Sequence, residues 1–174
     1  NTGLHIFDIT DMSNPVEVGF LELLYLAGLD VAYGFVLVTN NSGLSIVDIS
    51  DPTSPVEVSF IDPQGSIGDV VYKDGFAYMA TSGGGIRAIN VMNPYYPHLA
   101  GFYDAPGYTQ KLAVDGNYAY LATGGSTGLR VVDISNPYSM NEVAYFTTGG
   151  YNPNINDVSV DDGHVYVTDS GRGV

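Results

Sequence analysis

Residues 43–49 read Gly-Leu-Ser-Ile-Val-Asp-Ile, and closely similar phrases begin at Gly3, Gly85 and Gly128. Successive copies begin 40, 42 and 43 residues apart. Each phrase is rich in β-branched residues, which favour strands. A repeat of about 40–45 residues with this signature is typical of a β-propeller, in which every blade is a four-stranded sheet. The sequence therefore predicts an all-β fold, a propeller built from four repeats.

The second repeat shows the expected order of strands. A turn marked by Asp51-Pro52 follows the phrase, since aspartate and proline favour turns. Three strand-like segments come next, at residues 56–61, 68–72 and 76–81. Asp74-Gly75 separates the last two and favours a tight hairpin. The other repeats keep this order, with aromatic residues at one repeated position: Phe20, Phe60, Phe102 and Phe146.

The position of the phrase within a blade predicts how the chain is divided. We assign the phrase to the third strand, so the chain begins with the third and fourth strands of a blade and ends with the first and second. Residues 1–174 then form one propeller domain or propeller segment, with repeats at approximately 1–41, 42–83, 84–126 and 127–172. Either the two half-blades pair and close a four-bladed ring, or the chain is a segment of a larger propeller. The sequence leaves both alternatives open.

Composition limits the partners. Five basic residues against 19 acidic ones give a formal charge of −14. Such an acidic protein repels phosphates, so we expect no nucleic acid partner. No apolar run approaches the roughly 20 residues of a membrane helix, so we expect no membrane insertion. The chain has no cysteine, which excludes disulfides, thiolate metal sites and cysteine nucleophiles.

The repeat phrase resembles that of the LVIVD repeat family. The best copies of its pattern are Gly43 to Pro55, Gly116 to Ala122 and Gly128 to Pro137, and the resemblance covers nearly the whole chain. It implies β-propeller modules of bacterial and archaeal exported or surface proteins, most of them without an assigned activity. An extracellular or cell-surface location is therefore expected, with roles such as adhesion and protein binding.

Acidic residues near the first strand of each blade form one candidate site. When the repeats are aligned, one position is shared by Asp30, Asp69, Lys111 and Asp157. In this alignment the hairpin at Tyr33-Gly34 is two residues shorter than the corresponding hairpins of the other repeats. Inner strands line the channel of a propeller, so the three carboxylates would converge on its axis and hold a cation such as Ca²⁺. Alternatively, these residues accept hydrogen bonds from backbone amides of adjacent blades, with Lys111 as an ionic partner. No other cofactor is expected.

The loops that lead from one blade to the next form the second candidate site. They vary most between repeats and carry aromatic, amide and carboxylate side chains that suit a glycan or a protein partner. The candidate ligand-binding residues are Tyr25, Gln64, Asp104, Tyr108, Tyr151, Asn152 and Asn154. The alternative is that polar, glycine-rich loops are merely the usual composition of turns.

Other recurring residues predict structure. Asp8, Asp48, Asn90 and Asp133 precede the turn after the phrase, where each side chain can accept a backbone hydrogen bond. Residues 124–128 match the Gly-x-Ser-x-Gly pattern of serine hydrolases, but that pattern needs a turn from a strand into a helix. His5, His98 and His164 fall at different repeat positions, so no histidine cluster is expected.

Three functions remain open. The first is a non-enzymatic interaction or structural module that binds protein or glycan through its inter-blade loops. The second is a self-assembling ring or filament subunit, in which half-blades of neighbouring copies pair. The third is a metal-dependent hydrolase or lyase with a cation on the channel axis.

Overall fold

In the computed structural model, all regular secondary structure of the described residues is β-strand, which confirms the all-β prediction. The structure describes residues 2–65, 67–125, 127–147 and 154–170. Within these ranges, no helix is long and apolar enough to cross a membrane.

Three complete blades are four-stranded antiparallel sheets whose strands pair in chain order. Blade 1 contains β3 (Leu26–Ala32), β4 (Phe35–Asn40), β5 (Gly43–Asp48) and β6 (Val56–Ile61). Blade 2 contains β7 (Ile67–Lys73), β8 (Phe76–Thr81), β9 (Ile86–Asn90) and β10 (His98–Tyr103). Blade 3 contains β11 (Thr109–Asp115), β12 (Tyr118–Thr123), β13 (Gly128–Asp133) and β14 (Asn141–Phe146).

Two further sheets have only two strands each. The N-terminal half-blade is β1 (Gly3–Asp8) with β2 (Val16–Glu22), and the C-terminal half-blade is β15 (Ile155–Asp161) with β16 (His164–Asp169). The repeat phrase thus belongs to the third strand of each complete blade, as predicted.

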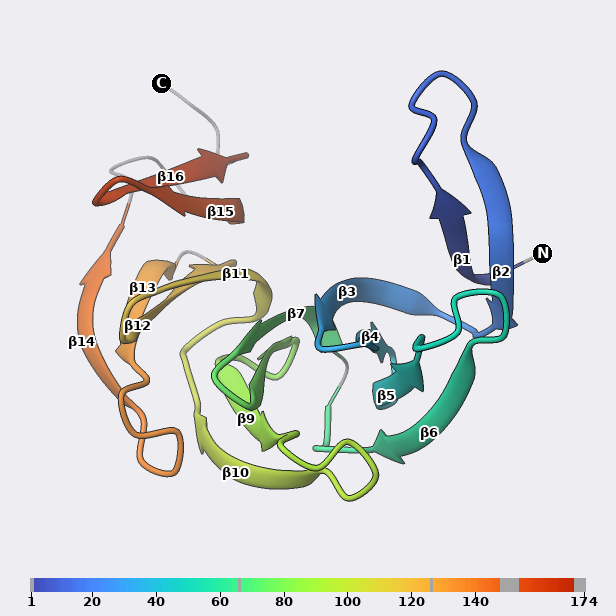
Figure 1. Ribbon diagram of the computed structural model, residues 1–174. Helices are drawn as coiled ribbons and strands as arrows, with labels where there is room; N and C mark the ends of the chain where they lie inside the picture. The colour runs from blue at the N-terminus through green and yellow to red at the C-terminus, as the bar shows by residue number, and fades with distance from the viewer. Residues whose placement is uncertain (1, 66, 126, 148–153, 171–174) are drawn as a thin grey trace.

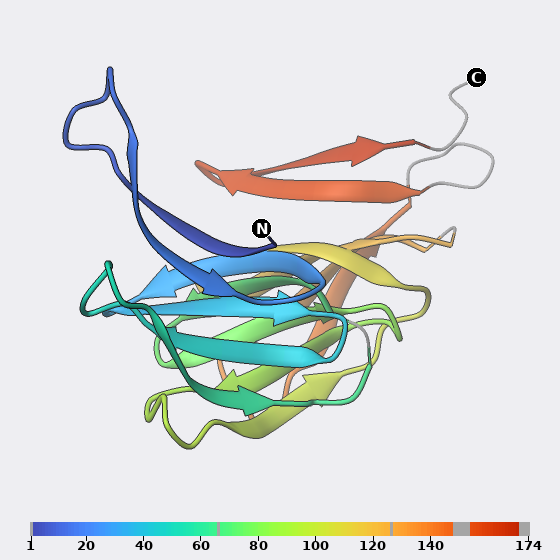
Figure 2. The ribbon, with the colours of Figure 1, turned by 90° about the vertical axis from the view of Figure 1, so that its right-hand side faces the viewer.

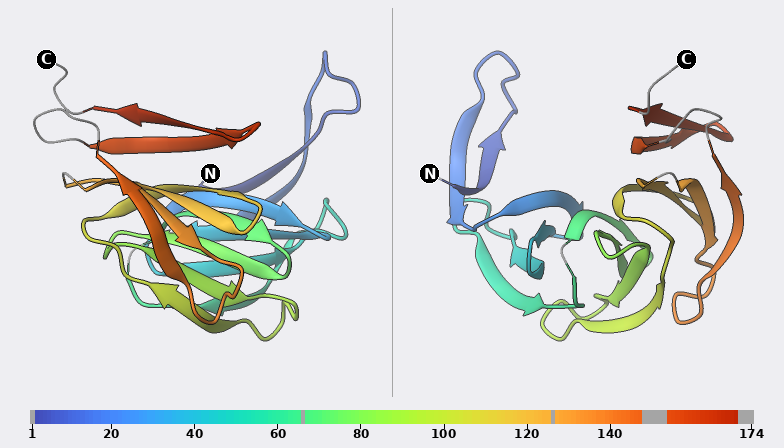
Figure 3. Two further views of the ribbon diagram at one scale, coloured as in Figure 1. Left: turned by 90° about the vertical axis from the view of Figure 1, so that its left-hand side faces the viewer. Right: turned by 180° about the vertical axis from the view of Figure 1, so that it is seen from behind.

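The blades follow one another around an open arc (Figure 1). On its inner side the first strand β7 contacts the first strands of both neighbouring blades, β3 and β11, and β6, β10 and β14 lie outside. The two half-blades stand at opposite ends of the arc, as the side view and the view from behind also show (Figures 2 and 3). They form separate sheets. The described residues therefore form no closed four-bladed ring.

The hydrophobic core lies between successive blades. Leu37 and Ile46 of blade 1 share one buried cluster with Met79 of blade 2, and Tyr78 of blade 2 shares the next with Leu121 of blade 3. Successive side chains of a strand point to opposite faces of its sheet. Each blade therefore buries apolar residues against the blade before it and the blade after it.

The first glycine of the phrase lies against the outer strand of its own blade in every copy. A Cβ atom there would collide with a backbone carbonyl oxygen: Gly3 with Leu21, Gly43 with Ile61, Gly85 with Tyr103, and Gly128 with Phe146. The close approach of the two backbones explains why the phrase always begins with glycine.

Strand pairing corrects one predicted repeat position. The third residue of the phrase lies opposite an aromatic residue in every copy: His5 opposite Phe20, Ser45 opposite Phe60, Arg87 opposite Phe102, and Arg130 opposite Tyr145. Tyr145, and not Phe146, therefore takes this position in blade 3. Phe146 was predicted because it is a phenylalanine like Phe20, Phe60 and Phe102. In the strand register, the aromatic residue always lies the same number of residues after the first glycine of the phrase, and in blade 3 that residue is Tyr145.

Candidate ligand-binding site

Strand pairing separates Asp30 from the other inner-strand residues. In blade 1 the residue equivalent to Asp69 is Gly28, because each pairs with the fifth residue of the second strand: Gly28 with Thr39 and Asp69 with Ala80. Lys111 and Asp157 pair in the same way. Asp30 is two positions further along β3. The single alignment position predicted for the four residues is therefore wrong for Asp30. The alignment assumed that the hairpin at Tyr33-Gly34 is two residues shorter than the others. It has the same two-residue turn, since Ala32 pairs with Phe35 as Lys73 pairs with Phe76.

Asp30 and Asp69 both bond to the following blade. Asp30 Oδ2 accepts a hydrogen bond from the Tyr72 N–H at 2.7 Å, and Asp69 Oδ2 accepts one from the Leu112 N–H at 3.4 Å. Burial raises the pKa of Asp69, although Lys111, with its Nζ 3.4 Å from Asp69 Oδ1, opposes this shift. These contacts favour the alternative of backbone hydrogen bonds between blades.

The third predicted metal ligand, Asp157, accepts a hydrogen bond from the Val158 N–H at 2.9 Å. Within the described part of the chain, no group of three or more acidic or histidine side chains is placed to hold a metal ion. A cation on the channel axis stays a prediction, and we do not carry it into the proposed function.

The turn after the phrase has the predicted hydrogen bonds. In each copy the side chain accepts a bond from the backbone N–H two residues later: Asp8 from Thr10, Asp48 from Ser50, Asn90 from Met92, and Asp133 from Ser135. Hydrogen bonds from the backbone and the hydroxyl group of the same partner residue lower the pKa of the three aspartates, and for Asp133 the bond with the Ser135 side chain has the larger effect. Since asparagine serves equally well in blade 2, the position is structural.

The predicted loop residues fall into separate groups. Tyr25 is 72% exposed in the connection to β3. Tyr108 donates a hydrogen bond from its hydroxyl to Asn154 Oδ1 at 2.8 Å, which joins two successive inter-blade loops. Gln64 and Asp104 line one hollow. Tyr151 and Asn152 lie outside the described residues.

The Gln64–Asp104 hollow is the best candidate for a binding site. Its volume is about 380 Å³, and it is lined by Asp62, Pro63, Gln64, Arg87, Leu99, Phe102 and Asp104. Asp62 Oδ1 accepts a hydrogen bond from the Gln64 N–H at 2.7 Å, which holds the loop backbone with Gln64 at a φ of 68°. Two loops that are far apart in sequence thus present an amide and two carboxylates to the same space.

Arg87 completes the hollow and was not predicted from the sequence. Its guanidinium Nη1 lies 2.8 Å from Asp104 Oδ1, and its Cζ lies 5.1 Å from the centre of the Phe102 ring. The ion pair fixes one carboxylate oxygen of Asp104, while Phe102 remains 54% exposed. The signal for Arg87 was present, since the third residue of the phrase varies between repeats and lies opposite the recurring aromatic residue.

Blade 3 uses the equivalent arginine differently. Arg130 Nη1 lies 3.0 Å from Glu142 Oε2, and the Tyr103 hydroxyl of blade 2 donates a hydrogen bond to the same carboxylate. Burial, reinforced by this bond, raises the pKa of Tyr103 to about 12. The cluster of Tyr103, Arg130 and Glu142 therefore joins blade 2 to blade 3.

This raised pKa predicts a loss of stability at alkaline pH. An unfolded tyrosine titrates near pH 10, whereas Tyr103 keeps its proton in the folded protein up to about pH 12. The stability that comes from the raised pKa of Tyr103 is therefore fully present below about pH 10 and is lost as the pH rises towards 12. We expect Tyr103→Phe to flatten the fall in urea-unfolding free energy between pH 9.5 and 11.5, ranges set by these pKa values. Tyr96→Phe, at a site that is 77% exposed, is the control and should leave the slope unchanged.

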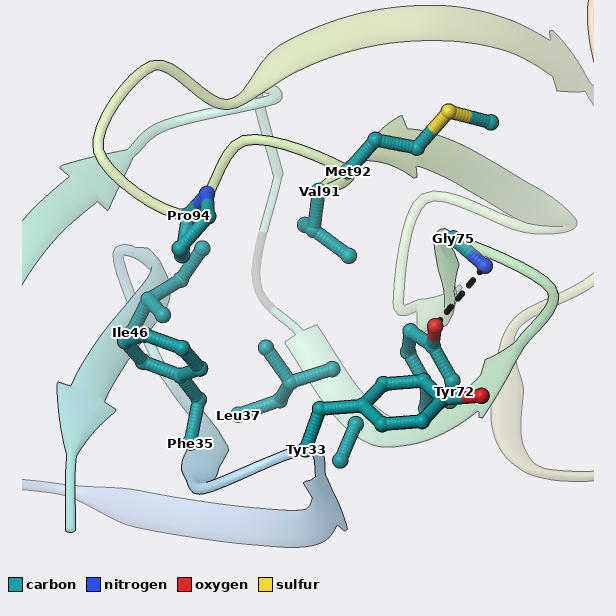
Figure 4. A pocket seen from close by; sticks show the side chains of 10 residues that line it. Tyr33, Phe35, Leu37, Ile46, Tyr72, Gly75, Val91, Met92 and Pro94 are labelled. Carbon is teal, nitrogen blue, oxygen red and sulfur yellow. Dashed lines mark hydrogen bonds between the residues drawn. The ribbon is translucent and has the colours of Figure 1, made fainter. Parts of the chain in front are cut away.

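An apolar inter-blade cavity of about 280 Å³ lies between blades 1 and 2 (Figure 4). Tyr33, Phe35 and Leu37 line it from blade 1, and Tyr72 and Met92 line it from blade 2. The Tyr72 hydroxyl accepts a hydrogen bond from the Gly75 N–H at 3.0 Å. The sequence did not predict this cavity, because its shape depends on how two blades fit together. It offers few polar groups to orient a ligand, so we rank it below the Gln64–Asp104 hollow.

The serine-hydrolase pattern has the wrong context for catalysis. Ser126, the serine of the pattern, lies outside the described residues. The pattern falls between the end of β12 at Thr123 and the start of β13 at Gly128, two strands of one sheet, and no helix follows among the described residues. His5 Nδ1 lies 2.9 Å from Glu17 Oε1, and His164 Nδ1 contacts the backbone oxygen of Asp162 at 2.8 Å. These two histidines belong to opposite half-blades.

Solved structures with similar folds include natural and designed proteins. The computationally designed Ika4 protein superposes with a TM-score of 0.66 at 12% identity, covering 87% of this chain and 90% of that one. A functionally unknown protein from Desulfotomaculum acetoxidans gives 0.74 at 17% identity, covering 91% of this chain and 54% of that one. The N-terminal domain of Nup159 gives 0.61 at 11% identity, covering 95% and 44%. This chain thus spans about half the length of the last two, and the likeness concerns the fold alone.

Among curated proteins, no relative matches this sequence. The family model of the LVIVD repeat matches four times, at residues 1–22, 28–62, 64–105 and 106–148. Together with the strand order, these matches show that the chain is a member of the LVIVD repeat family with a propeller-like arrangement of blades.

Proposed function

We propose that this chain is a non-enzymatic interaction module of an exported or cell-surface protein, and that it binds a neutral glycan in the Gln64–Asp104 hollow. The observation that carries the proposal is the meeting of Gln64 and Asp104, from different loops, around an exposed aromatic ring. The proposed location rests on membership of the family.

The chemistry of the hollow supports a sugar ligand. A sugar ring has an apolar face and a rim of hydroxyl groups. Phe102 and Leu99, which are 54% and 44% exposed, supply apolar surface. The Gln64 amide and the carboxylates of Asp62 and Asp104 supply donors and acceptors for hydroxyls. The volume is within the range of small-molecule sites, from about 300 to 1,000 Å³.

Charge favours a neutral glycan over an anionic one. The hollow contains two carboxylates and one guanidinium, and the guanidinium is already paired with Asp104. The whole chain carries a formal charge of −14, which repels sulfated or sialylated glycans.

Truncating the aromatic ring should weaken binding most clearly. We expect Phe102→Ala to reduce the affinity for a responding neutral oligosaccharide at least about tenfold, because the apolar platform is lost. The measurement is calorimetric titration with a panel of neutral oligosaccharides. Tyr96→Ala is the matched control, since Tyr96 is an aromatic residue that is 77% exposed at the opposite end of the β9–β10 pair.

Three results would contradict the proposal. The first is binding that Phe102→Ala and Tyr96→Ala weaken equally. The second is binding of protein partners but of no oligosaccharide, which would favour the protein-binding alternative. The third is turnover of a sugar, lactone or ester by the purified chain.

A further inference from the structure

The apolar inter-blade cavity has an aliphatic inner end and aromatic sides. Every residue that lines it belongs to the complete blades 1 and 2. Leu37 and Ile46, which are almost fully buried, form its inner end. In Figure 4 the Tyr33 and Tyr72 rings lie on one side of the cavity and the Phe35 ring lies on the other. Among the described residues that line the cavity none is charged, so it suits an uncharged, apolar occupant.

Tyr33, at the mouth of this cavity, has a strained backbone. It is the first residue of the two-residue turn between β3 and β4, where its φ is 48°. In the corresponding hairpins this place is taken by residues that adopt a positive φ more readily, Asp74, Gly116 and Asp162. Tyr33 is 89% exposed, and the centre of its ring lies 5.8 Å from that of Tyr72 in an edge-on contact. The turn does not need a tyrosine, so the strain at Tyr33 points to a role for its ring.

The lining of the cavity is specific to the interface between blades 1 and 2. At the equivalent places between blades 2 and 3 the side chains are smaller or polar: Asp74 for Tyr33, Val114 for Tyr72, and Ser135 for Met92. Blade 2 also has Tyr78 where blade 1 has Leu37, and Tyr78 is buried in the cluster between blades 2 and 3. The repeat itself therefore does not require the aromatic lining of the cavity.

We propose that the apolar inter-blade cavity binds a small, uncharged aromatic compound of about two fused rings. Its volume is about 280 Å³, compared with about 150 Å³ for an apolar cavity that holds one benzene molecule. Aromatic rings pack edge-on or offset against other rings, and the flexible thioether of Met92 adapts to them. The Tyr72 hydroxyl oxygen accepts the Gly75 N–H bond, and a phenol can donate at the same time, so Tyr72 can donate to an acceptor atom of the ligand.

Charge decides between a neutral ligand and a cationic one. Aromatic rings attract cations, and the formal charge of −14 adds to that attraction at the surface. The inner end of the cavity, however, consists of Leu37 and Ile46, so a cation there would lose its hydration without gaining a carboxylate partner. A neutral ligand is therefore favoured. The cavity shares no lining residue with the Gln64–Asp104 hollow, and the inference does not depend on glycan binding.

The test is calorimetric titration at neutral pH with two flat probes of the same shape. Quinoline is uncharged and has an acceptor nitrogen, whereas N-methylquinolinium carries a permanent positive charge. We expect quinoline to bind at least about tenfold more tightly than N-methylquinolinium, because only the cation loses favourable hydration. Absence of quinoline binding, or tighter binding of N-methylquinolinium, would overturn the proposal.

Replacing Tyr33 tests the role of its ring. Tyr33→Asn should weaken quinoline binding at least about fivefold, because one aromatic side of the cavity is lost. The melting temperature of the unliganded chain should not fall, because asparagine adopts the positive φ of this turn readily. Tyr96→Asn is the control, since Tyr96 is an exposed tyrosine that does not line the cavity, and it should leave quinoline affinity unchanged. Equal weakening by the two variants, or a lower melting temperature of Tyr33→Asn, would overturn the role assigned to Tyr33.

Filling the cavity provides a second, independent test. Leu37 pairs with Ile46, and the equivalent pair in blade 2 is Tyr78 with Ala88. The double variant Leu37→Tyr/Ile46→Ala copies that pair into blade 1, and the fold already buries both side chains at the equivalent positions of blade 2. We expect this variant to keep the circular dichroism spectrum of the unchanged chain and to lose detectable quinoline binding. Unchanged binding by the folded double variant would overturn the proposal.

Discussion

Gly43→Ala is expected to lower the free energy of unfolding by about 3 kcal/mol. A Cβ atom at Gly43 would collide with the carbonyl oxygen of Ile61 and approach the Phe60 ring to 2.8 Å. The obstacle is backbone of the same sheet, so relief requires β5 and β6 to move apart. For a chain of this length we expect the melting temperature to fall by about 6–12 °C, measured by calorimetry or circular dichroism.

Gly83→Ala is the matched control for this prediction. Gly83 has open space where its Cβ would lie and does not have a positive φ. We therefore expect a change within about 0.5 kcal/mol. If Gly43→Ala and Gly83→Ala had the same melting temperature, the close approach of the first glycine to the outer strand would not explain why every copy of the phrase begins with glycine.

Glu142→Ala is expected to destabilise the chain by about 2–3 kcal/mol. Glu142 pairs with Arg130, and the two side chains are only 23% and 12% exposed. Its loss leaves the Arg130 guanidinium in a largely buried position without its carboxylate, and it also removes the acceptor of the Tyr103 hydroxyl. Urea unfolding at neutral pH measures the change.

The same repeat position provides the control. Glu57 in blade 1 is equivalent to Glu142, since it lies opposite Val47 as Glu142 lies opposite Val132, but Glu57 is exposed. Glu57→Ala should change stability by less than about 0.5 kcal/mol. The double variant Arg130→Met/Glu142→Leu should recover much of the loss, because both charges are then absent. Equal losses in Glu142→Ala and Glu57→Ala would show that the ion pair contributes nothing.

The repeat in the sequence was sufficient to predict the blades. The phrase could be assigned to the third strand of each blade, and this assignment gave the order of strands along the chain. Each phrase also contains a residue that accepts a backbone hydrogen bond, which predicted the turns at Asp8, Asp48, Asn90 and Asp133. The position of Asp30 did not follow, because the repeats were aligned by residue type. That alignment assigned the difference in length between repeats to the hairpin that joins the first and second strands. The pairing of Ala32 with Phe35 shows that these differences lie in other connections.

The candidate site could be predicted only in part. Exposed inter-blade loops pointed to Gln64 and Asp104, and the structure brings both to one hollow. Their partner Arg87 comes from a strand, where sequence reasoning gave no special role to the third residue of the phrase. The apolar inter-blade cavity depends on the fit of two blades, which no local pattern encodes.

The most direct test of the proposed binding site is a map of amide chemical-shift changes in the labelled chain during titration with neutral oligosaccharides. We predict that the largest changes fall on Gln64, Arg87 and Asp104, with Phe102 beside them. Changes centred on Tyr33 and Tyr72 would instead place the ligand in the apolar inter-blade cavity, and a spectrum unchanged by every oligosaccharide would contradict the proposed function.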